Sequence, residues 1–136
     1  MQIETQAFAP TNGVQYGSDV ESLCYLDGNL DIILACSKDK DETVHGLKIH
    51  FSQPSGFRFL DEADLARYWI SRSFAGGSHV LEVKNGGWSA EEDVLQTFET
   101  ARREWLVVSG NACVSVFCLH EPELMDMSWK YSSRAL

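Results

Sequence analysis

The sequence predicts a single α+β domain, residues 1–136, built mainly on an antiparallel β-sheet of about five to seven strands with one or two helices packed on one face. Three observations lead to this fold class. The chain has 136 residues, a length that suits one domain. Apolar residues make up 44% of it, enough for one hydrophobic core. Short apolar runs of strand length alternate with turn residues along most of the chain.

The first part of the chain reads as a lead-in followed by an antiparallel meander. Residues 1–18 contain Pro10 and an Asn12-Gly13 pair, so we expect them to be irregular or weakly paired. Asp27 and Gly28 tolerate the positive φ of a tight turn, which predicts a hairpin over residues 23–36. The expected strands of the meander are 21–26, 30–36 and 44–52.

A helix is expected after a short extended segment at residues 57–60. Asp61 is a suitable N-cap, because its carboxylate can accept hydrogen bonds from the first N–H groups of a helix. The apolar residues that follow recur at helical spacing, which predicts a helix over 61–71. Its apolar face would be formed by Leu65, Tyr68 and Trp69.

The last part of the chain predicts one strand, one short helix and a central hairpin. Residues 79–84 alternate as a strand does. Ser89 and Glu92 have the spacing of a capping box, which favours a helix over about 90–100. Residues 103–119 predict a hairpin in the middle of the sheet, because 113–119 is almost entirely apolar. Residues 123–136 are expected to form an irregular or helical tail over the core.

The charge of the chain limits its partners. Twenty acidic and 11 basic side chains give a formal charge of −9. Neutralising phosphate requires clustered Lys and Arg, so we expect no nucleic-acid partner and no anionic membrane surface. The N-terminus lacks the basic and apolar regions of a secretory signal, and no run reaches transmembrane length, so a cytoplasmic location is expected.

The search for catalytic, metal and cofactor signatures gives no candidate. Cys113 and Cys118 lie five residues apart and would point to opposite faces of a strand, which disfavours a zinc site with His120. An apolar environment would also make Cys118 a poor nucleophile. We therefore predict no catalytic residue, no metal and no cofactor, although partners that meet in space leave a reactive Cys118–His120 contact open.

Acidic residues occur in three short clusters, one of which follows an aromatic side chain. The clusters are Asp39-Asp41-Glu42, Glu91-Glu92-Asp93 and Glu121-Glu123-Asp126. Such clusters are most often solvated faces, and the middle one also suits the start of a helix. Trp88 beside it is either a lid over the core or an exposed anchor with a charged rim. The candidate binding residues are Trp88, Glu91, Glu92 and Asp93.

The order of several blocks between residues 56 and 123 resembles small uncharacterised bacterial proteins associated with polymorphic or contact-dependent toxin systems, which are immunity-protein-like. These blocks are Gly56-Phe57-Arg58-Phe59-Leu60-Asp61-Glu62, Asp64-Leu65, Tyr68-Trp69, Gly86-Gly87-Trp88, Arg103-Glu104-Trp105-Leu106-Val107-Val108, Asn111-Ala112-Cys113-Val114-Ser115-Val116 and Glu121-Pro122. The resemblance covers about half the chain. It implies a compact α+β protein that binds and blocks one cognate toxin domain, and it implies no residue-level binding map.

The expected function is therefore a non-enzymatic, acidic protein-binding module with a basic partner, such as a toxin domain. Toxin domains that cleave nucleic acid are basic near their active sites, so an acidic inhibitor would associate with them quickly. Two alternatives remain open. One is a small hydrolase-like enzyme with a carboxylate or His pair in a cleft, where His79 or His120 could take part. The other is a structural protein whose acidic face joins a homo-oligomer.

Overall fold

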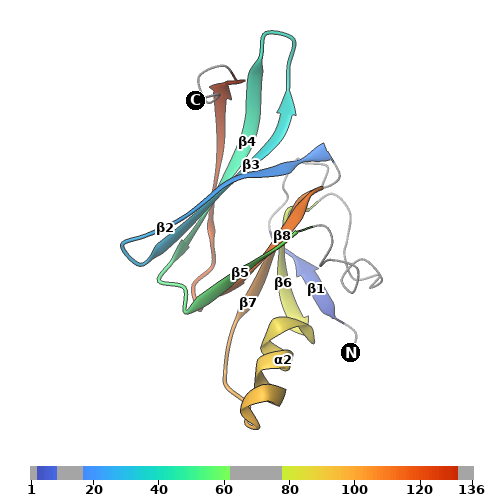
Figure 1. Cartoon of the computed structure of the whole chain (residues 1–136), viewed down its shortest axis with the longest axis vertical. Coiled ribbons are helices and arrows are strands. Elements are labelled where there is room, and N and C mark those ends of the chain that lie inside the picture. The colour runs from blue at the N-terminus through green and yellow to red at the C-terminus, as the bar shows by residue number, and fades with distance from the viewer. Residues whose placement is uncertain (1–2, 9–16, 62–77, 132–136) are drawn as a thin grey trace.

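The computed structural model describes residues 3–8, 17–61 and 78–131, and this part of the chain contains nine strands and one helix (Figure 1). In chain order, the elements are β1 (Glu4–Ala7), β2 (Asp19–Leu26), β3 (Asn29–Lys38), β4 (Thr43–Ser52), β5 (Gly56–Asp61), β6 (Val80–Asn85), α2 (Gly87–Gln96), β7 (Glu104–Val108), β8 (Ala112–Phe117) and β9 (Glu123–Lys130).

The strands form two antiparallel sheets, with the orders β1-β6-β7-β8-β5 and β2-β3-β4-β9. The predicted, mainly antiparallel β-structure with a helix is confirmed. The single sheet of five to seven strands is wrong, because nine strands divide between two sheets. One face of each sheet contributes apolar side chains to a shared core cluster.

The main core lies between the two sheets. Leu30, Ile32 and Phe51 from the second sheet are fully buried, as are Trp105 and Val114 from the first, and all belong to one cluster. The indole N–H of Trp105 donates to the backbone oxygen of Cys118 at 3.0 Å, so the largest buried side chain also has its polar group satisfied.

The predicted meander is confirmed. β2 pairs with β3 and β3 with β4, each antiparallel. The turn between β2 and β3 places Asp27 at φ 53° and Gly28 at φ 80°. Two successive positive φ values match the right-handed twist of the flanking strands, which is why this dipeptide predicts the hairpin correctly.

Long-range pairing decides the structure at the two ends of the chain. Within the lead-in expected to be irregular or weakly paired, residues 4–7 form the short edge strand β1, which pairs with β6. Within the tail expected to be irregular or helical, residues 123–130 form β9, which pairs with β4 along its length. Both are edge strands whose hydrogen-bond partners lie far away in the sequence, so their local patterns are weak.

The hairpin of β7 and β8 lies in the middle of the first sheet, as predicted. Every residue of both strands is buried. Alternation along them divides the apolar residues between the main core and a second cluster on the opposite face, formed by Ile3, Leu81, Leu106, Val108 and Cys113. Cys113 and Cys118 accordingly belong to different clusters, as their odd spacing predicts.

The two predicted helices have different outcomes. Asp61, the expected N-cap of the first, is the last residue of β5, and the rest of the expected helix at 61–71, including Trp69, lies outside the described residues. The second helix is confirmed as α2, although it begins at Gly87 and ends at Gln96. Within the described ranges, no helix has the length and apolar character needed to cross a membrane.

Candidate functional site

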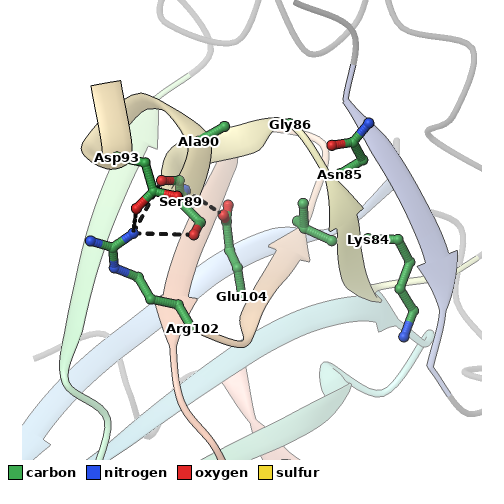
Figure 2. Close-up of a pocket in the computed structure, with 9 residues that line it drawn as sticks. Lys84, Asn85, Gly86, Ser89, Ala90, Asp93, Arg102 and Glu104 are labelled. Atoms are coloured by element: carbon green, nitrogen blue, oxygen red, sulfur yellow. Dashed lines mark hydrogen bonds and ion pairs between the residues drawn. The ribbon is translucent and has the colours of Figure 1, made fainter. Parts of the chain in front are cut away.

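The N-terminus of helix α2 is capped by a carboxylate from the neighbouring sheet (Figure 2). The N–H groups of Trp88 and Ser89 donate to the two carboxylate oxygens of Glu104, at 3.1 and 2.8 Å. Glu104 is the first residue of β7 and is only 2% exposed. Gly86, which precedes the helix, contributes no side-chain cap. The capping carboxylate therefore comes from a residue that follows the helix in the sequence.

The capping box expected from Ser89 and Glu92 is wrong, because α2 begins two residues before Ser89. Gly87 makes this earlier start possible. It has a φ of 71°, and a Cβ at this position would lie 3.0 Å from one oxygen of Glu104 and 3.1 Å from the other. The local sequence contains the Gly86-Gly87 pair but gives no sign of Glu104, which is 15 residues beyond Ser89.

The electrostatics of Glu104 reflect its burial. Loss of solvation raises the pKa of its carboxyl above the ordinary value of 4.5, and the hydrogen bonds from Ser89 and Trp88 oppose that shift. A carboxyl of raised pKa beside a cavity has the character of a general acid. Here, however, both oxygens accept N–H groups of α2, and the arrangement stabilises the start of the helix.

Trp88 lies against the sheet. Its ring stacks on that of Phe117 with centroids 4.0 Å apart and an interplanar angle of 18°. The guanidinium of Arg58 lies 4.9 Å from the Trp88 ring centroid, and the indole N–H donates to Glu92 at 3.0 Å. Through these contacts, the half-buried Trp88 packs α2 against the first sheet. Its part in binding a partner stays a prediction.

The acidic cluster Glu91-Glu92-Asp93 lies in the middle of α2, past its first turn, and two of its members pair with arginines. Glu91 pairs with Arg58 at 3.3 Å, and Asp93 pairs with Arg102 at 2.7 Å. Asp93 also accepts the N–H of Thr100 at 3.1 Å. The structure thus brings the four predicted binding residues together on one helix, and Trp88, Glu91 and Asp93 also hold that helix in place. Whether they bind a partner stays a prediction.

A small polar cavity separates α2 from the end of β6 (Figure 2). Its volume is about 190 Å³, and Glu104, Asp93 and Arg102 line it together with Lys84. Pockets for drug-sized ligands have volumes of roughly 300–1,000 Å³, so this one suits a small polar molecule or a single side chain. Lys84 is paired with Glu82 on its own strand at 3.1 Å.

The far end of α2 is apolar and exposed. All residues from 94 to 101 are exposed, and they include Val94 (71%), Leu95 (76%) and Phe98 (61%). Figure 1 shows the helix at one end of the long axis of the molecule, beyond the ends of the strands. These apolar residues fall within the helix predicted at about 90–100, but nothing in the local sequence marks them as a surface. Their spacing alone does not reveal that the sheet stops short of them.

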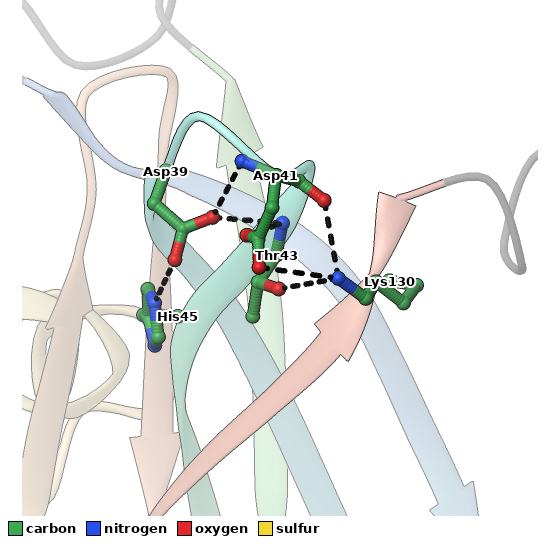
Figure 3. Close-up of polar contacts among 5 residues, drawn as sticks. All are labelled: Asp39, Asp41, Thr43, His45 and Lys130. Carbon is green, nitrogen blue, oxygen red and sulfur yellow. Dashed lines mark hydrogen bonds and ion pairs between the residues drawn. The ribbon is translucent and has the colours of Figure 1, made fainter.

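A second acidic cluster organises the turn between β3 and β4, at the opposite end of the molecule from α2 (Figures 1 and 3). Asp39 accepts the N–H groups of Asp41 and Thr43 at 3.2 and 3.1 Å, and it contacts Nε2 of His45 at 3.0 Å. Lys130 pairs with Asp41 at 3.4 Å. These carboxylates shape a turn, and cations offset their charge.

The predicted cysteine and histidine candidates lie apart from α2. Cys118 is 2% exposed and contacts the backbone oxygen of Ser52 at 3.2 Å, whereas His120 is exposed. His79 is buried beside the hydroxyl of Ser18 at 3.0 Å, and burial lowers its pKa. Among the described residues, no group of three or more His, Cys, Asp or Glu side chains is arranged to hold a metal ion.

The chain matches no protein-family model, and no characterised protein or solved structure is significantly similar to it. The geometry of α2 and its surroundings is therefore what supports a function.

Proposed function

We propose that this protein is a non-enzymatic, acidic binding module that neutralises a basic partner protein, as an immunity protein neutralises a cognate toxin domain. The observation that carries this proposal is the charge at the α2 end of the molecule. The carboxylates at its surface are Glu91, Glu92, Asp93 and Glu99, since Glu104 is buried at the start of the helix. The arginines in contact with the helix or its acidic side chains are Arg58 and Arg102. Among the described residues at this end, negative charge is thus in excess, because Lys84 beside the cavity is itself paired with Glu82.

The turn between β3 and β4 supports the choice of α2 by contrast. Its carboxylates are Asp39, Asp41 and Glu42, and its lysines are Lys38, Lys40 and Lys130. Lys38 pairs with Glu42 at 3.3 Å and Lys130 with Asp41. Opposite charges therefore balance at this turn, and a basic protein would gain less by approaching it than by approaching α2.

Excess negative charge favours fast association with a basic surface. Electrostatic steering raises association rates by roughly 10- to 1,000-fold and weakens as salt screens the charges. A toxin domain that acts on nucleic acid needs a basic surface for phosphate. An acidic protein seated on that surface would exclude the substrate without performing any reaction of its own.

Trp88, Glu91, Glu92 and Asp93 are proposed as the centre of this surface. Glu91 and Asp93 supply charge while paired with arginines, so replacing them would disturb the helix as well as any partner contact. Glu92 and Glu99 provide a cleaner test. Glu92 contacts the Trp88 indole and, at 3.5 Å, Gln96, and both carboxylates can be changed to amides that keep their shape.

The proposal is tested by co-expression with the reading frame that neighbours the gene. We expect the neighbouring product to arrest growth and this protein to restore it through a stable complex. Glu92→Gln combined with Glu99→Gln should slow association and flatten its salt dependence. Asp19→Asn combined with Asp27→Asn is the matched control, since it changes the charge equally on the exposed side of β2 and its turn. No rescue and no complex would refute the proposal for that pair.

A further inference from the structure

The exposed end of α2 combines an apolar surface with surrounding carboxylates. Val94, Leu95 and Phe98 are 71%, 76% and 61% exposed, and Glu92 and Glu99 flank them in the sequence. Residues 88–93 are half-buried against the sheet, whereas residues 94–101 are all exposed. Large exposed apolar side chains gathered at one place mark interaction sites more often than scattered ones do.

The backbone of Thr97 and the side chains of Asp93 and Arg102 hold this exposed segment in a fixed shape. Thr97 ends the helix in the left-handed conformation, with φ 63° and ψ 17°, and its N–H donates to the backbone oxygen of Val94. That conformation is strained for a β-branched residue. Asp93 then accepts the N–H of Thr100, and Arg102 donates to Asp93 and to the backbone oxygen of Ser89. The chain after the helix is therefore fastened back onto the helix itself.

Such fastening matters because it lowers the entropy lost on binding. A segment whose backbone is already ordered loses less conformational entropy when a partner binds it than a flexible segment does. Asp93 has a role here that differs from a direct contact. It positions the segment that carries Phe98 and leaves the contact itself to the apolar side chains.

Resting on the proposed function, we propose that Val94, Leu95 and Phe98 form the apolar anchor of the docking surface and that its partner is a basic amphipathic element. The charge around the anchor argues for this occupant over a second copy of the chain. Two copies would bring like carboxylates together at a net charge of −9 each. An element with an apolar face bordered by Lys or Arg would satisfy both the anchor and the carboxylates around it.

The test uses the full chain and a synthetic helical peptide with leucines on one face and lysines on the other. Amide NMR spectra during titration should show shifts concentrated at residues 92–99. A Val94→Ser, Leu95→Ser, Phe98→Ser variant should bind about tenfold more weakly or worse. The control is Leu26→Ser, Leu119→Ser, Met125→Ser, which removes apolar groups of similar exposure (65%, 71% and 62%) elsewhere. Phe98→Ala alone serves if the triple variant loses its fold by circular dichroism.

The outcomes separate this inference from the proposed function. Three results would refute the apolar anchor. The peptide could bind the wild type and the α2 variant equally, it could shift amide resonances centred away from residues 92–99, or it could fail to bind the wild type. Self-association that the α2 variant abolishes would make a second copy the occupant and would also overturn the anchor. If the neighbouring toxin domain binds the wild type and the α2 variant equally, the immunity function is supported and the apolar anchor is refuted. If the toxin domain is not bound while the peptide still shifts residues 92–99, the apolar anchor is supported and the immunity function is refuted.

Discussion

Replacing Glu104 by alanine is expected to destabilise the fold by about 2–4 kcal/mol. Two hydrogen bonds to a charged acceptor are lost, each contributing about 1.5–3 kcal/mol, and the N–H groups of Trp88 and Ser89 lose their acceptors. Part of that loss is recovered, because the alanine variant no longer buries a carboxylate that is only 2% exposed. Urea unfolding followed by circular dichroism measures the difference.

The loss of stability caused by the amide variant Glu104→Gln, measured relative to wild type, is expected to depend on pH. Burial raises the folded pKa of Glu104 above the 4.5 of the unfolded chain, so the folded state holds the proton more tightly. By linkage, the wild-type protein then loses stability as pH rises from about 4.5 through the folded pKa. Gln carries no such titration. The cost of Glu104→Gln relative to wild type should therefore be larger near pH 4 than near pH 8.

Comparison with wild type at each pH removes the other titrating groups from this test, because both proteins share them. Glu99→Gln, at an exposed carboxylate, should change stability by no more than about 0.5 kcal/mol. A cost for Glu104→Ala no larger than that control would show that Glu104 does not hold the helix. A gap between Glu104→Gln and wild type that stays constant with pH would refute the burial argument.

Three further predictions follow from backbone geometry and burial. Thr97→Gly should stabilise the protein by up to about 1 kcal/mol in urea unfolding, since glycine adopts the left-handed conformation without a Cβ; a loss of stability would contradict this. Gly46→Ala should lower the free energy of unfolding by several times RT and shift the tryptophan fluorescence of the protein. The reason is that a Cβ would collide with a backbone oxygen of β3 and come within 2.8 Å of the Trp129 ring. An unchanged urea midpoint and an unchanged emission spectrum would contradict this. Iodoacetamide should label the exposed Cys24 in the native protein long before Cys113, whose pKa burial raises to about 12, and equal labelling rates by mass spectrometry would contradict that order.

Local patterns in the sequence were sufficient for the elements whose partners are close along the chain. The Asp27-Gly28 turn gives the β2–β3 hairpin, and the apolar run after the turn at 109–111 gives β8 with β7 beside it. In both, the hydrogen bonds join segments a few residues apart, so turn chemistry and alternation decide the pairing. The strand at 123–130 and the partner of β1 were not predicted, because β4 and β6, which pair with β9 and β1, lie far away in the chain.

The candidate site shows the same division. The acidic cluster at 91–93 and its place within a helix follow from the sequence, whereas its expected place at the helix start is wrong, because α2 begins at Gly87 and has no acidic residue in its first turn. The cap does not, because it comes from Glu104 on β7 and requires Gly87 to bring the backbone close to that carboxylate. Likewise, the apolar spacing of Val94, Leu95 and Phe98 predicts a helix face, yet the sequence cannot say where the sheet ends beneath it.

By itself, the sequence determined the antiparallel β-structure, the central hairpin, the presence of α2 and a net charge of −9, because propensity, alternation and charge are properties of neighbouring residues. Only the tertiary structure decided that the strands divide into two sheets, that Arg58 and Arg102 partly offset one acidic cluster while lysines balance another, and that the end of α2 is exposed. These features depend on which distant segments meet, and burial and charge pairing are set by that meeting.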